Sequence, residues 1–257
     1  DVAVHSTVPH SSGLSSSAAL EIALLRSLTQ LHGLSLKPEE LAKIGQQIEH
    51  QFVGTQCGIM DQMVSACGSS RQAIFLDCER LQTKSLPLFS NHTFIVIHSG
   101  STRKLSQGSY NERKEETTVA SKTLNVLSLR YASLEQINLI KDPTIQKRAK
   151  HIISENNRVI QAVSCLEKND AKKFGELMYL SHQSMRDDFE ISSDELNRVV
   201  ETANNNCALG ARLTGAGFGG CVIVLTENEK AELMIESILS QCHKSSLITT
   251  ISGKLNT

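Results

Sequence analysis

Apolar and polar residues form helical patterns in the N-terminal part of the chain, after one short strand pattern. Apolar residues recur every three or four positions over 18–31, which predicts a helix that Gly33 ends. Pro38, a residue favoured at the first helical position, predicts a second helix through Glu49. In front of both, alternating residues predict a strand over 2–5. The chain therefore opens with a strand and two helices.

The rest of the chain is predicted to be rich in helices. β-Branched and aromatic residues predict strands, and capping residues mark where helices begin. The predicted strands are 73–77, 93–98, 211–213 and 221–225. The predicted helices are Met60–Cys67, 109–129, one opened by Pro143, one capped by Asp170, one after the capping box Ser192-x-x-Glu195 and one after Thr226-x-x-Glu229. Because strands and helices are grouped rather than strictly alternating, the pattern favours an α+β fold.

The side-chain charges nearly balance, with 26 Lys+Arg, 27 Asp+Glu and a net charge of -1. Without a basic excess no nucleic-acid surface is expected, and no apolar stretch reaches the length of a membrane span. The seven cysteines are odd in number and include no CxxC pair. Free thiols in a reducing compartment, and hence a cytoplasmic protein, are expected rather than disulfides or a zinc site.

The first candidate site is the segment Gly13-Leu14-Ser15-Ser16-Ser17, between the predicted strand and the first helix. Backbone N–H groups at a helix N-terminus carry a partial positive charge and suit phosphate, and serine hydroxyls can add donors or reach Mg²⁺. The alternative interpretation is a plain serine cap, because serine is a favoured cap residue. A Walker loop is excluded because GxxxxGK[ST] is absent.

The second candidate site contains two carboxylates, Glu49 and Asp61, which lie twelve positions apart (61 − 49) and are joined by a glycine-bearing loop. Phosphoryl transfer needs one group that binds Mg²⁺ and another that orients or deprotonates the acceptor hydroxyl. The alternative is two exposed acidic side chains, which are common. His50 is expected to be a structural or surface residue rather than a metal ligand. Cys57 is expected to be a small buried thiol rather than a nucleophile.

The third candidate is a glycine-rich segment over 214–221, with glycines at Gly215, Gly217, Gly219 and Gly220. It superficially resembles GxGxxG but enters a strand instead of a helix, which argues against a dinucleotide fold. The alternative interpretation is a tight turn between strands that needs positive φ.

Taken in this order, the three motifs resemble the GHMP kinase superfamily. The string Cys-Gly-Ile-Met-Asp-Gln at 57–62 is similar to galactokinases in particular, and segments 108–113 and 184–190 add to the resemblance. The resemblance implies a two-domain GHMP kinase fold of the α+β class. Residues 1–92 would be the remainder of an N-terminal, ribosomal protein S5 domain 2-like domain that binds the ATP phosphates. Residues 93–257 would be a helix-rich, ferredoxin-like C-terminal domain, with the site in the cleft between the two.

The resemblance also implies roles for individual residues. Asp61 would be the catalytic base and would face the sugar's anomeric hydroxyl, and Ser17 and Glu49 would hold Mg²⁺. Gly58 and Tyr110 would contact the sugar together with Asp61, and the glycine-rich turn would support the phosphate loop. The residues implied to bind the ATP phosphates are Ser11, Ser12, Gly13, Leu14, Ser15, Ser16 and Ser17.

By the same resemblance, the intact protein transfers the γ-phosphoryl group of MgATP to the anomeric hydroxyl of galactose, as a monomeric cytoplasmic enzyme of galactose metabolism. N-acetylgalactosamine or arabinose as acceptor, a non-catalytic galactose sensor and an inactive fragment are the alternatives. The family usually has glycine where this chain has Ser11, which puts ATP affinity in question. The family's N-terminal signature, which supplies an arginine and most sugar contacts, has no counterpart here. Residues 1–257 alone are therefore expected to show negligible galactokinase turnover. They are also expected to be poorly soluble or oligomeric unless the missing segment associates with them.

Overall fold

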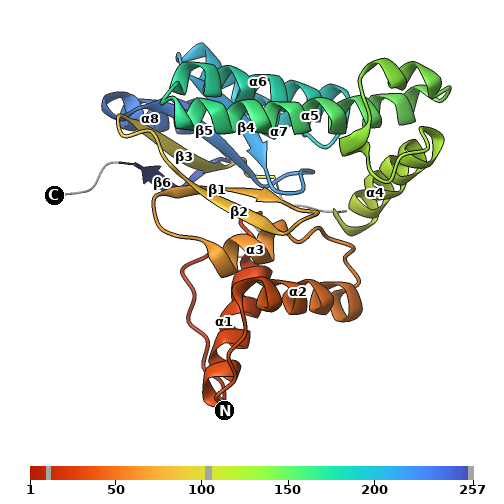
Figure 1. Cartoon of the computed structure of the whole chain (residues 1–257). Coiled ribbons are helices and arrows are strands. Elements are labelled where there is room, and N and C mark those ends of the chain that lie inside the picture. Colours follow the sequence, from red (N-terminus) through yellow and green to blue (C-terminus); the bar gives the residue numbers. More distant parts are fainter. Residues whose placement is uncertain (10–12, 102–105, 254–257) are drawn as a thin grey trace. The chain divides into compact units, whose positions relative to one another are not determined.

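The computed structural model describes residues 1–9, 13–101 and 106–253 of the chain. The chain divides into two compact units, Asp1–Leu88 and Phe89–Thr257 (Figure 1). The boundary predicted from the sequence lies after residue 92.

The first unit contains three α-helices and a β-hairpin. Its elements are α1 (Ser16–Leu31), α2 (Pro38–Ile48), the π-helical turn η1 (Glu49–Val53), α3 (Met60–Cys67), and the antiparallel strands β1 (Gln72–Asp77) and β2 (Gln82–Pro87). The predicted helices are confirmed, and α3 has the predicted bounds. The hairpin's second strand was not predicted, because its residues are mostly polar and exposed.

The ends of α1 and α2 follow from the sequence in the predicted way. Gly33 has φ +64°, and its N–H donates to the carbonyl of Gln30 while the N–H of Leu34 donates to that of Thr29. This pair of hydrogen bonds is a Schellman motif, which satisfies carbonyls at a helix C-terminus. Pro38 is the first residue of α2, as expected.

The core of the first unit lies where the three helices meet. Its buried members come from all three helices and the residue before α3. They are Ile22, Leu41, Ala42, Ile59, Met63 and Ala66. At about 25 cal/mol per Å² of apolar surface, this shared burial is the main force that holds the three helices together.

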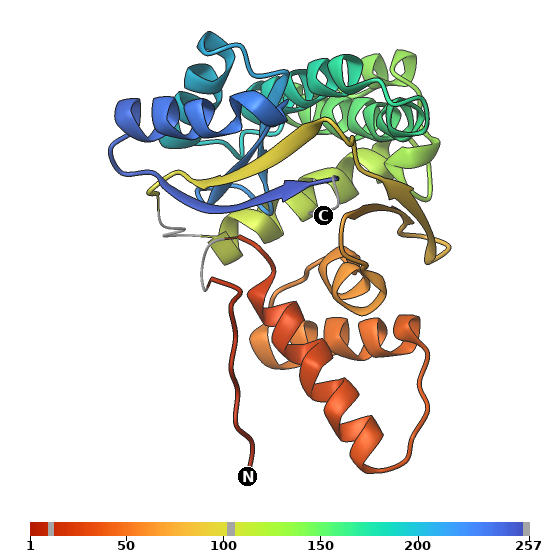
Figure 2. The ribbon, with the colours of Figure 1, turned by 90° about the vertical axis from the view of Figure 1, so that its left-hand side faces the viewer.

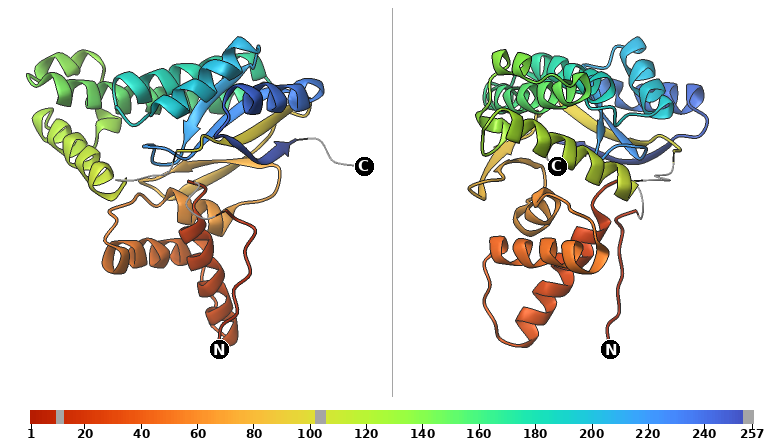
Figure 3. Two further views of the ribbon diagram at one scale, coloured as in Figure 1. Left: turned by 180° about the vertical axis from the view of Figure 1, so that it is seen from behind. Right: turned by 90° about the vertical axis from the view of Figure 1, so that its right-hand side faces the viewer.

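The predicted strand over 2–5 is wrong. These residues form no strand in the structure and run as a coil (Figure 3), with Val2 73% and Val4 60% exposed. An alternating pattern becomes a strand only when a neighbouring strand accepts its backbone hydrogen bonds. Within the described residues, no strand pairs with this segment.

The second unit is built on a four-stranded antiparallel sheet with the order β4-β5-β3-β6. The strands are β3 (His92–His98), β4 (Gly210–Thr214), β5 (Cys221–Glu227) and β6 (Ser246–Ser252). The helices are α4 (Ser106–Thr123), α5 (Pro143–Glu167), α6 (Ala171–Asp187), α7 (Asp194–Asn205) and α8 (Ala231–Gln241), with the short 3₁₀ turns η2 (Leu129–Tyr131), η3 (Glu135–Leu139) and η4 (Asn228–Lys230). Helices α6, α7 and α8 pack on the sheet (Figure 2), and the main core lies between these layers.

Helix starts in the second unit agree with the sequence in two cases and differ in two. The Asp142 carboxylate, just before Pro143, caps α5, and Asp170 caps α6 through the Lys173 N–H at 2.9 Å, as predicted. The box starting at Ser192 is wrong, because Ser193 is the N-cap of α7 and accepts from the Leu196 N–H. Ser192 instead donates to Asn197.

The cap predicted at Thr226 is also wrong, because this residue belongs to β5 and is 1% exposed. The turn η4 lies between β5 and α8. The helix predicted over 109–129 ends at Thr123. Strand β6 was not predicted, since an edge strand that is mostly exposed has a weak apolar pattern.

Candidate active site

Within the described residues, no side chain caps the start of α1. Gly13 and Ser15 have φ of +83° and +57°, and the Ser15 side chain, although at the N-cap position, makes no cap hydrogen bond. A serine in the left-handed region is uncommon, and backbone strain of this kind clusters at functional sites. The plain-cap interpretation therefore does not fit, and the free amides suit an anion. Ser11 and Ser12 lie outside the described residues.

Glu49 is positioned by a change of helical pitch at the end of α2. The chain widens into η1, which closes at Gly54 with φ +79°, and the N–H groups of Gly54 and Thr55 both reach the carbonyl of Glu49. π-Helical turns of this kind are frequent at functional sites. The Glu49 side chain is buried, with 7% exposed. It is therefore not one of the exposed acidic residues of the alternative interpretation.

The loop before Asp61 is tied to this same turn. The amide of Gln46 donates to the carbonyl of Cys57 over 3.1 Å, and His50 Nε2 lies 2.9 Å from the same oxygen. His50 thus has the expected structural role. Gly58 follows the tethered carbonyl, and a methyl group built on it would meet nothing within 4 Å. Asp61 lies in the first turn of α3.

Three carboxylates share this neighbourhood. Burial raises the pKa of the Cys57 thiol, and the charges of Glu49, Asp61 and Glu21 raise it further. The thiol is therefore held in its protonated form, and it is half-buried, not fully buried as expected. Sequence reasoning missed Glu21, although its spacing of one helical turn from Ser17 was a readable signal.

The carboxyl group of Glu21 has an unusual pKa. Burial raises its pKa to about 7, the charge of Glu49 adds to the rise, and a hydrogen bond from Gln62 opposes it. The charged form is penalised because Glu21 is partly withdrawn from water beside a second carboxylate.

The carboxylates have no positive partner in the described part of the chain. There, none of Glu21, Glu49 and Asp61 forms an ion pair with lysine or arginine. No group of three or more His, Cys, Asp or Glu side chains in the same part is arranged to enclose a metal. This donor set fits Mg²⁺, which commonly takes one or two carboxylates and completes its shell with water and substrate phosphates.

In the second unit, Tyr110 of α4 lines a cavity of about 310 Å³ together with the first residues of the glycine-rich turn. Arg113, Lys114, Phe189 and Phe218 also line it. Tyr110 and the turn, which the sequence analysis named separately, thus share one cavity.

The glycine-rich segment is a turn between the antiparallel strands β4 and β5. Positive φ values occur at Gly215, Gly217, Gly219 and Gly220. The turn is anchored by the Phe218 N–H on the carbonyl of Ile191 at 2.7 Å and by the Gly220 N–H on that of Ser101 at 3.2 Å. A side chain at 217 would collide with the Ile191 carbonyl, so glycine is required there by both φ and space.

The comparisons with known proteins agree with one another. Residues 1–69 match the family described as GHMP kinases N terminal domain, and residues 162–244 match GHMP kinases C terminal. The galactokinase of Pasteurella multocida (strain Pm70) is 41% identical over 93% of this chain, and that of Glaesserella parasuis serovar 5 is 43% identical over 95%. The solved Lactococcus lactis galactokinase in complex with galactose is 34% identical, with a TM-score of 0.91 over 96% of this chain and 68% of that chain.

This chain belongs to the galactokinase family of GHMP kinases. The expected two-domain GHMP kinase fold is confirmed. Mevalonate kinase of Methanococcus jannaschii, at 22% identity and a TM-score of 0.65, shares the fold. The chain spans 64% and 66% of the length of the P. multocida and G. parasuis galactokinases. In the part that the structure describes, no helix is long and apolar enough to span a bilayer.

The candidate residues of this galactokinase-family chain fall into two sets, one in each unit. Ser17, Glu49, Gly58 and Asp61 belong to the first unit with the phosphate loop, and Glu49 and Asp61 lie close enough for both to act on Cys57. Tyr110 and the glycine-rich turn form the second set.

Segment 184–190, which contributed to the galactokinase resemblance, holds the second unit together. Arg148 of α5 is 1% exposed and pairs with Glu116 at 2.8 Å and Glu190 at 2.9 Å, and it donates to the carbonyl of Asp188 at 2.6 Å. Arg113 donates to the carbonyl of Phe189 at 2.8 Å. These bonds fix the chain just before Ile191, which anchors the glycine-rich turn.

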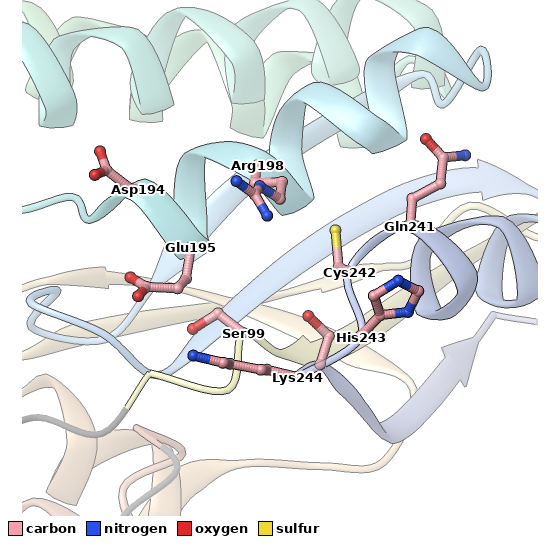
Figure 4. Close-up of a pocket in the computed structure, with 9 residues that line it drawn as sticks. Ser99, Asp194, Glu195, Arg198, Gln241, Cys242, His243 and Lys244 are labelled. Atoms are coloured by element: carbon pink, nitrogen blue, oxygen red, sulfur yellow. The ribbon is translucent and has the colours of Figure 1, made fainter.

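A further cavity of the second unit, of about 340 Å³, contains none of the candidate site residues (Figure 4). Its walls carry both signs of charge, from Asp194 and Glu195 at the start of α7 and from Arg198 and Lys244.

Two buried histidines predict an acid-sensitive second unit. Burial lowers the pKa values of His151 and His182 to about 4, against about 6.5 in an unfolded chain. Between these pH values the unfolded state binds more protons, so stability is full above pH 6.5 and falls as the pH drops toward 4. The loss amounts to roughly 3 kcal/mol per histidine.

The measurement is the free energy of unfolding between pH 7 and 4.5. His182 accepts the Leu213 N–H at Nδ1 and lies 3.2 Å from Asn197 at Nε2. We expect His182→Gln to be less stable at pH 7 and to show a shallower pH slope. An unchanged slope would mean that His182 does not titrate with folding.

Proposed function

We propose that the protein, in its full natural length, is a cytoplasmic galactokinase. It transfers the γ-phosphoryl group of ATP to the anomeric hydroxyl of D-galactose and forms galactose 1-phosphate and ADP. The observation that carries the proposal is the buried Glu49, whose charge acts on Cys57 together with those of Asp61 and Glu21, in the unit that also contains the α1 N-terminus, where Ser15 makes no cap hydrogen bond. The galactokinases of similar sequence, one of them solved with galactose, support the choice of sugar.

In this proposal the phosphate loop and the acidic residues have separate tasks. The loop of Ser11, Ser12, Gly13, Leu14, Ser15, Ser16 and Ser17 contacts the ATP phosphates. Ser17 and Glu49 hold Mg²⁺, which neutralises phosphate charge when it is bound. Asp61 takes the proton of the anomeric hydroxyl as the sugar oxygen forms its bond to the γ-phosphorus. The bond to the β-phosphate oxygen breaks, ADP leaves, and Asp61 returns its proton to solvent.

The proposal gives the residues of the second unit a role in positioning. Tyr110 contacts the sugar from α4, and the glycine-rich turn supports the phosphate loop. The cavity that Tyr110 shares with Gly215 supports this assignment, because both charged and aromatic residues line it. Recognition of a sugar commonly needs both kinds of surface.

The decisive experiment is a coupled ADP-release assay on the full-length protein with galactose, N-acetylgalactosamine and arabinose. We expect MgATP turnover with galactose well above that with the other two sugars. Preference for another sugar would mean that the proposed acceptor is wrong, whereas the proposed kinase activity would stand. Binding of galactose and ATP without turnover would identify a sensor and refute the enzymatic proposal.

Gly58 provides a test of the sugar site with little risk to the fold. Because a methyl group there meets nothing within 4 Å, Gly58→Ala should leave stability nearly unchanged. If galactose packs against Gly58, the methyl should raise the KM for galactose roughly tenfold, since overpacking costs about 1–3 kcal/mol. Gly108→Ala, another glycine with open space, is the matched control. Equal KM values for the two variants would remove Gly58 from the sugar site.

A further inference from the structure

Glu21 lies at a junction of the three helices of the first unit. It follows Ser17 by one turn of α1, and its Oε2 accepts a hydrogen bond of 3.3 Å from Nε2 of Gln62 on α3. Gln62 directly follows Asp61 and is 2% exposed. Glu21 also acts on Glu49, which ends α2. One side chain therefore connects the helices that carry Ser17, Glu49 and Asp61.

Helix α2 contains a glycine that makes room for this junction. A Cβ on Gly45 would lie 3.0 Å from Cγ of Gln62 and 3.2 Å from Oε2 of Glu21. These distances are shorter than ordinary contacts, so an alanine would press on both partners. A glycine inside a helix costs about 1 kcal/mol relative to alanine. The helix thus gives up stability at the place where the Glu21–Gln62 contact needs space.

The contact itself is a poor source of stability. In the described part of the chain, the buried Gln62 Oε1 has no hydrogen-bond partner, and an unsatisfied buried group costs about 1–3 kcal/mol. Glu21 places a second carboxylate beside Glu49, and like charges at short distance repel. An apolar pair would fill the same place at less cost. A costly polar contact next to catalytic groups indicates a functional reason for keeping it.

We propose that Glu21 is a positioning residue: through Gln62 it fixes the start of α3, and with it the carboxylate of Asp61, relative to Glu49. This inference rests on the proposed kinase function, in which Asp61 must meet the acceptor hydroxyl. At metal sites, losing a hydrogen bond between a ligand and the residue that orients it commonly lowers metal affinity or activity 10–100-fold. Among the described residues, the bond from Gln62, the residue next to Asp61, connects Glu21 to the start of α3.

The test compares Glu21→Ala, Glu21→Gln and Gln62→Ala in the full-length protein. Glu21→Ala removes the acceptor, whereas Glu21→Gln keeps an oxygen that can accept from Gln62. We expect Glu21→Ala to lower kcat about 10–100-fold with the KM values for galactose and MgATP within about twofold, and Glu21→Gln to retain most of kcat. Glu79→Ala, at an exposed carboxylate of the same unit, should match the wild type.

A double-mutant cycle tests the route through Gln62. If both residues act along one path, Glu21→Ala combined with Gln62→Ala should lower kcat no further than either change alone. Multiplied losses would overturn the route. Equal failure of Glu21→Gln and Glu21→Ala, together with weaker Mg²⁺ binding in calorimetry, would mean that Glu21 holds the metal and would overturn the positioning role.

A readout that needs no turnover separates this inference from the proposed function. Hydrogen–deuterium exchange of the α3 backbone should be at least about tenfold faster in Glu21→Ala than in Glu79→Ala, and Glu21→Gln should restore protection. A wild type that phosphorylates no sugar would refute the proposed function while this exchange still decides whether Glu21 holds α3. Unchanged exchange would overturn the inference whatever the activity.

Discussion

Replacing Asp61 with asparagine is expected to lower kcat at least ~100-fold, the low end for a positioned acid–base group. Asparagine keeps the shape and a hydrogen-bonding oxygen but cannot accept the proton of the sugar hydroxyl. Galactose and MgATP should therefore still bind, which calorimetry can measure beside steady-state kinetics. An Asp61→Asn protein that folds and keeps the wild-type kcat would refute Asp61 as the base.

The comparison with Glu49→Gln makes this test specific. Glu49 is proposed to hold Mg²⁺, so its loss should raise the KM for ATP and the Mg²⁺ concentration needed for activity, in addition to lowering the rate. Asp61→Asn should change neither of these two quantities. Two carboxylates without function would give small and similar effects, because surface substitutions usually change stability by under ~0.5 kcal/mol. Matching kinetic profiles for the two variants would mean that the proposed division of roles is wrong.

Replacing Arg148 with methionine is expected to lower the free energy of unfolding of the second unit by about 3 kcal/mol. Removing one partner of a buried ion pair costs about 3–5 kcal/mol, because the other charge remains buried without compensation. The lower value applies because Glu116 keeps Arg113, at 3.0 Å, and Glu190 is half exposed. The carbonyl of Asp188 also loses a donor.

Differential scanning calorimetry measures this effect. At about 2–4 °C per kcal/mol, the melting temperature should fall by roughly 6–12 °C. Lys147→Met on the same helix is the matched control, because Lys147 is 52% exposed and pairs over 3.7 Å with Glu190, which is 48% exposed. Exposed pairs contribute about 0–1 kcal/mol. Equal shifts for the two variants would show that the buried network around Arg148 does not support the fold.

The sequence by itself determined the elements whose signals are local. A proline at a first helical position predicted the start of α2, Gly33 predicted the end of α1, and the run before Gly68 predicted α3 with its bounds. These features act within one helical turn, so they need no distant partner. The candidate phosphate loop and the glycine-rich turn could be proposed from the sequence for the same reason, because both depend on small residues close together in the chain.

The sequence also placed Glu49 and Asp61 as candidate partners, through their order among the motifs. It did not reveal that Glu49 is buried, since burial depends on the helices that pack around it. Glu21, Gly45 and Gln62 belong to three different helices, and their contact exists only after the helices pack. No local pattern could indicate that contact, although the spacing of Ser17 and Glu21 pointed to one face of α1.

Tertiary structure alone decided the features that require a partner from elsewhere in the chain. The alternating residues over 2–5 form no strand in the described part of the chain, whereas the mostly exposed segment Ser246–Ser252 does, because it pairs with β3. Arg148 reads as an ordinary helix residue, yet it is the buried centre of bonds to residues that lie 32 to 42 positions away. A strand needs a neighbouring strand for its backbone hydrogen bonds, and a buried charge needs residues that surround and pair with it. These partners are distant in the sequence, so only the folded chain brings them together.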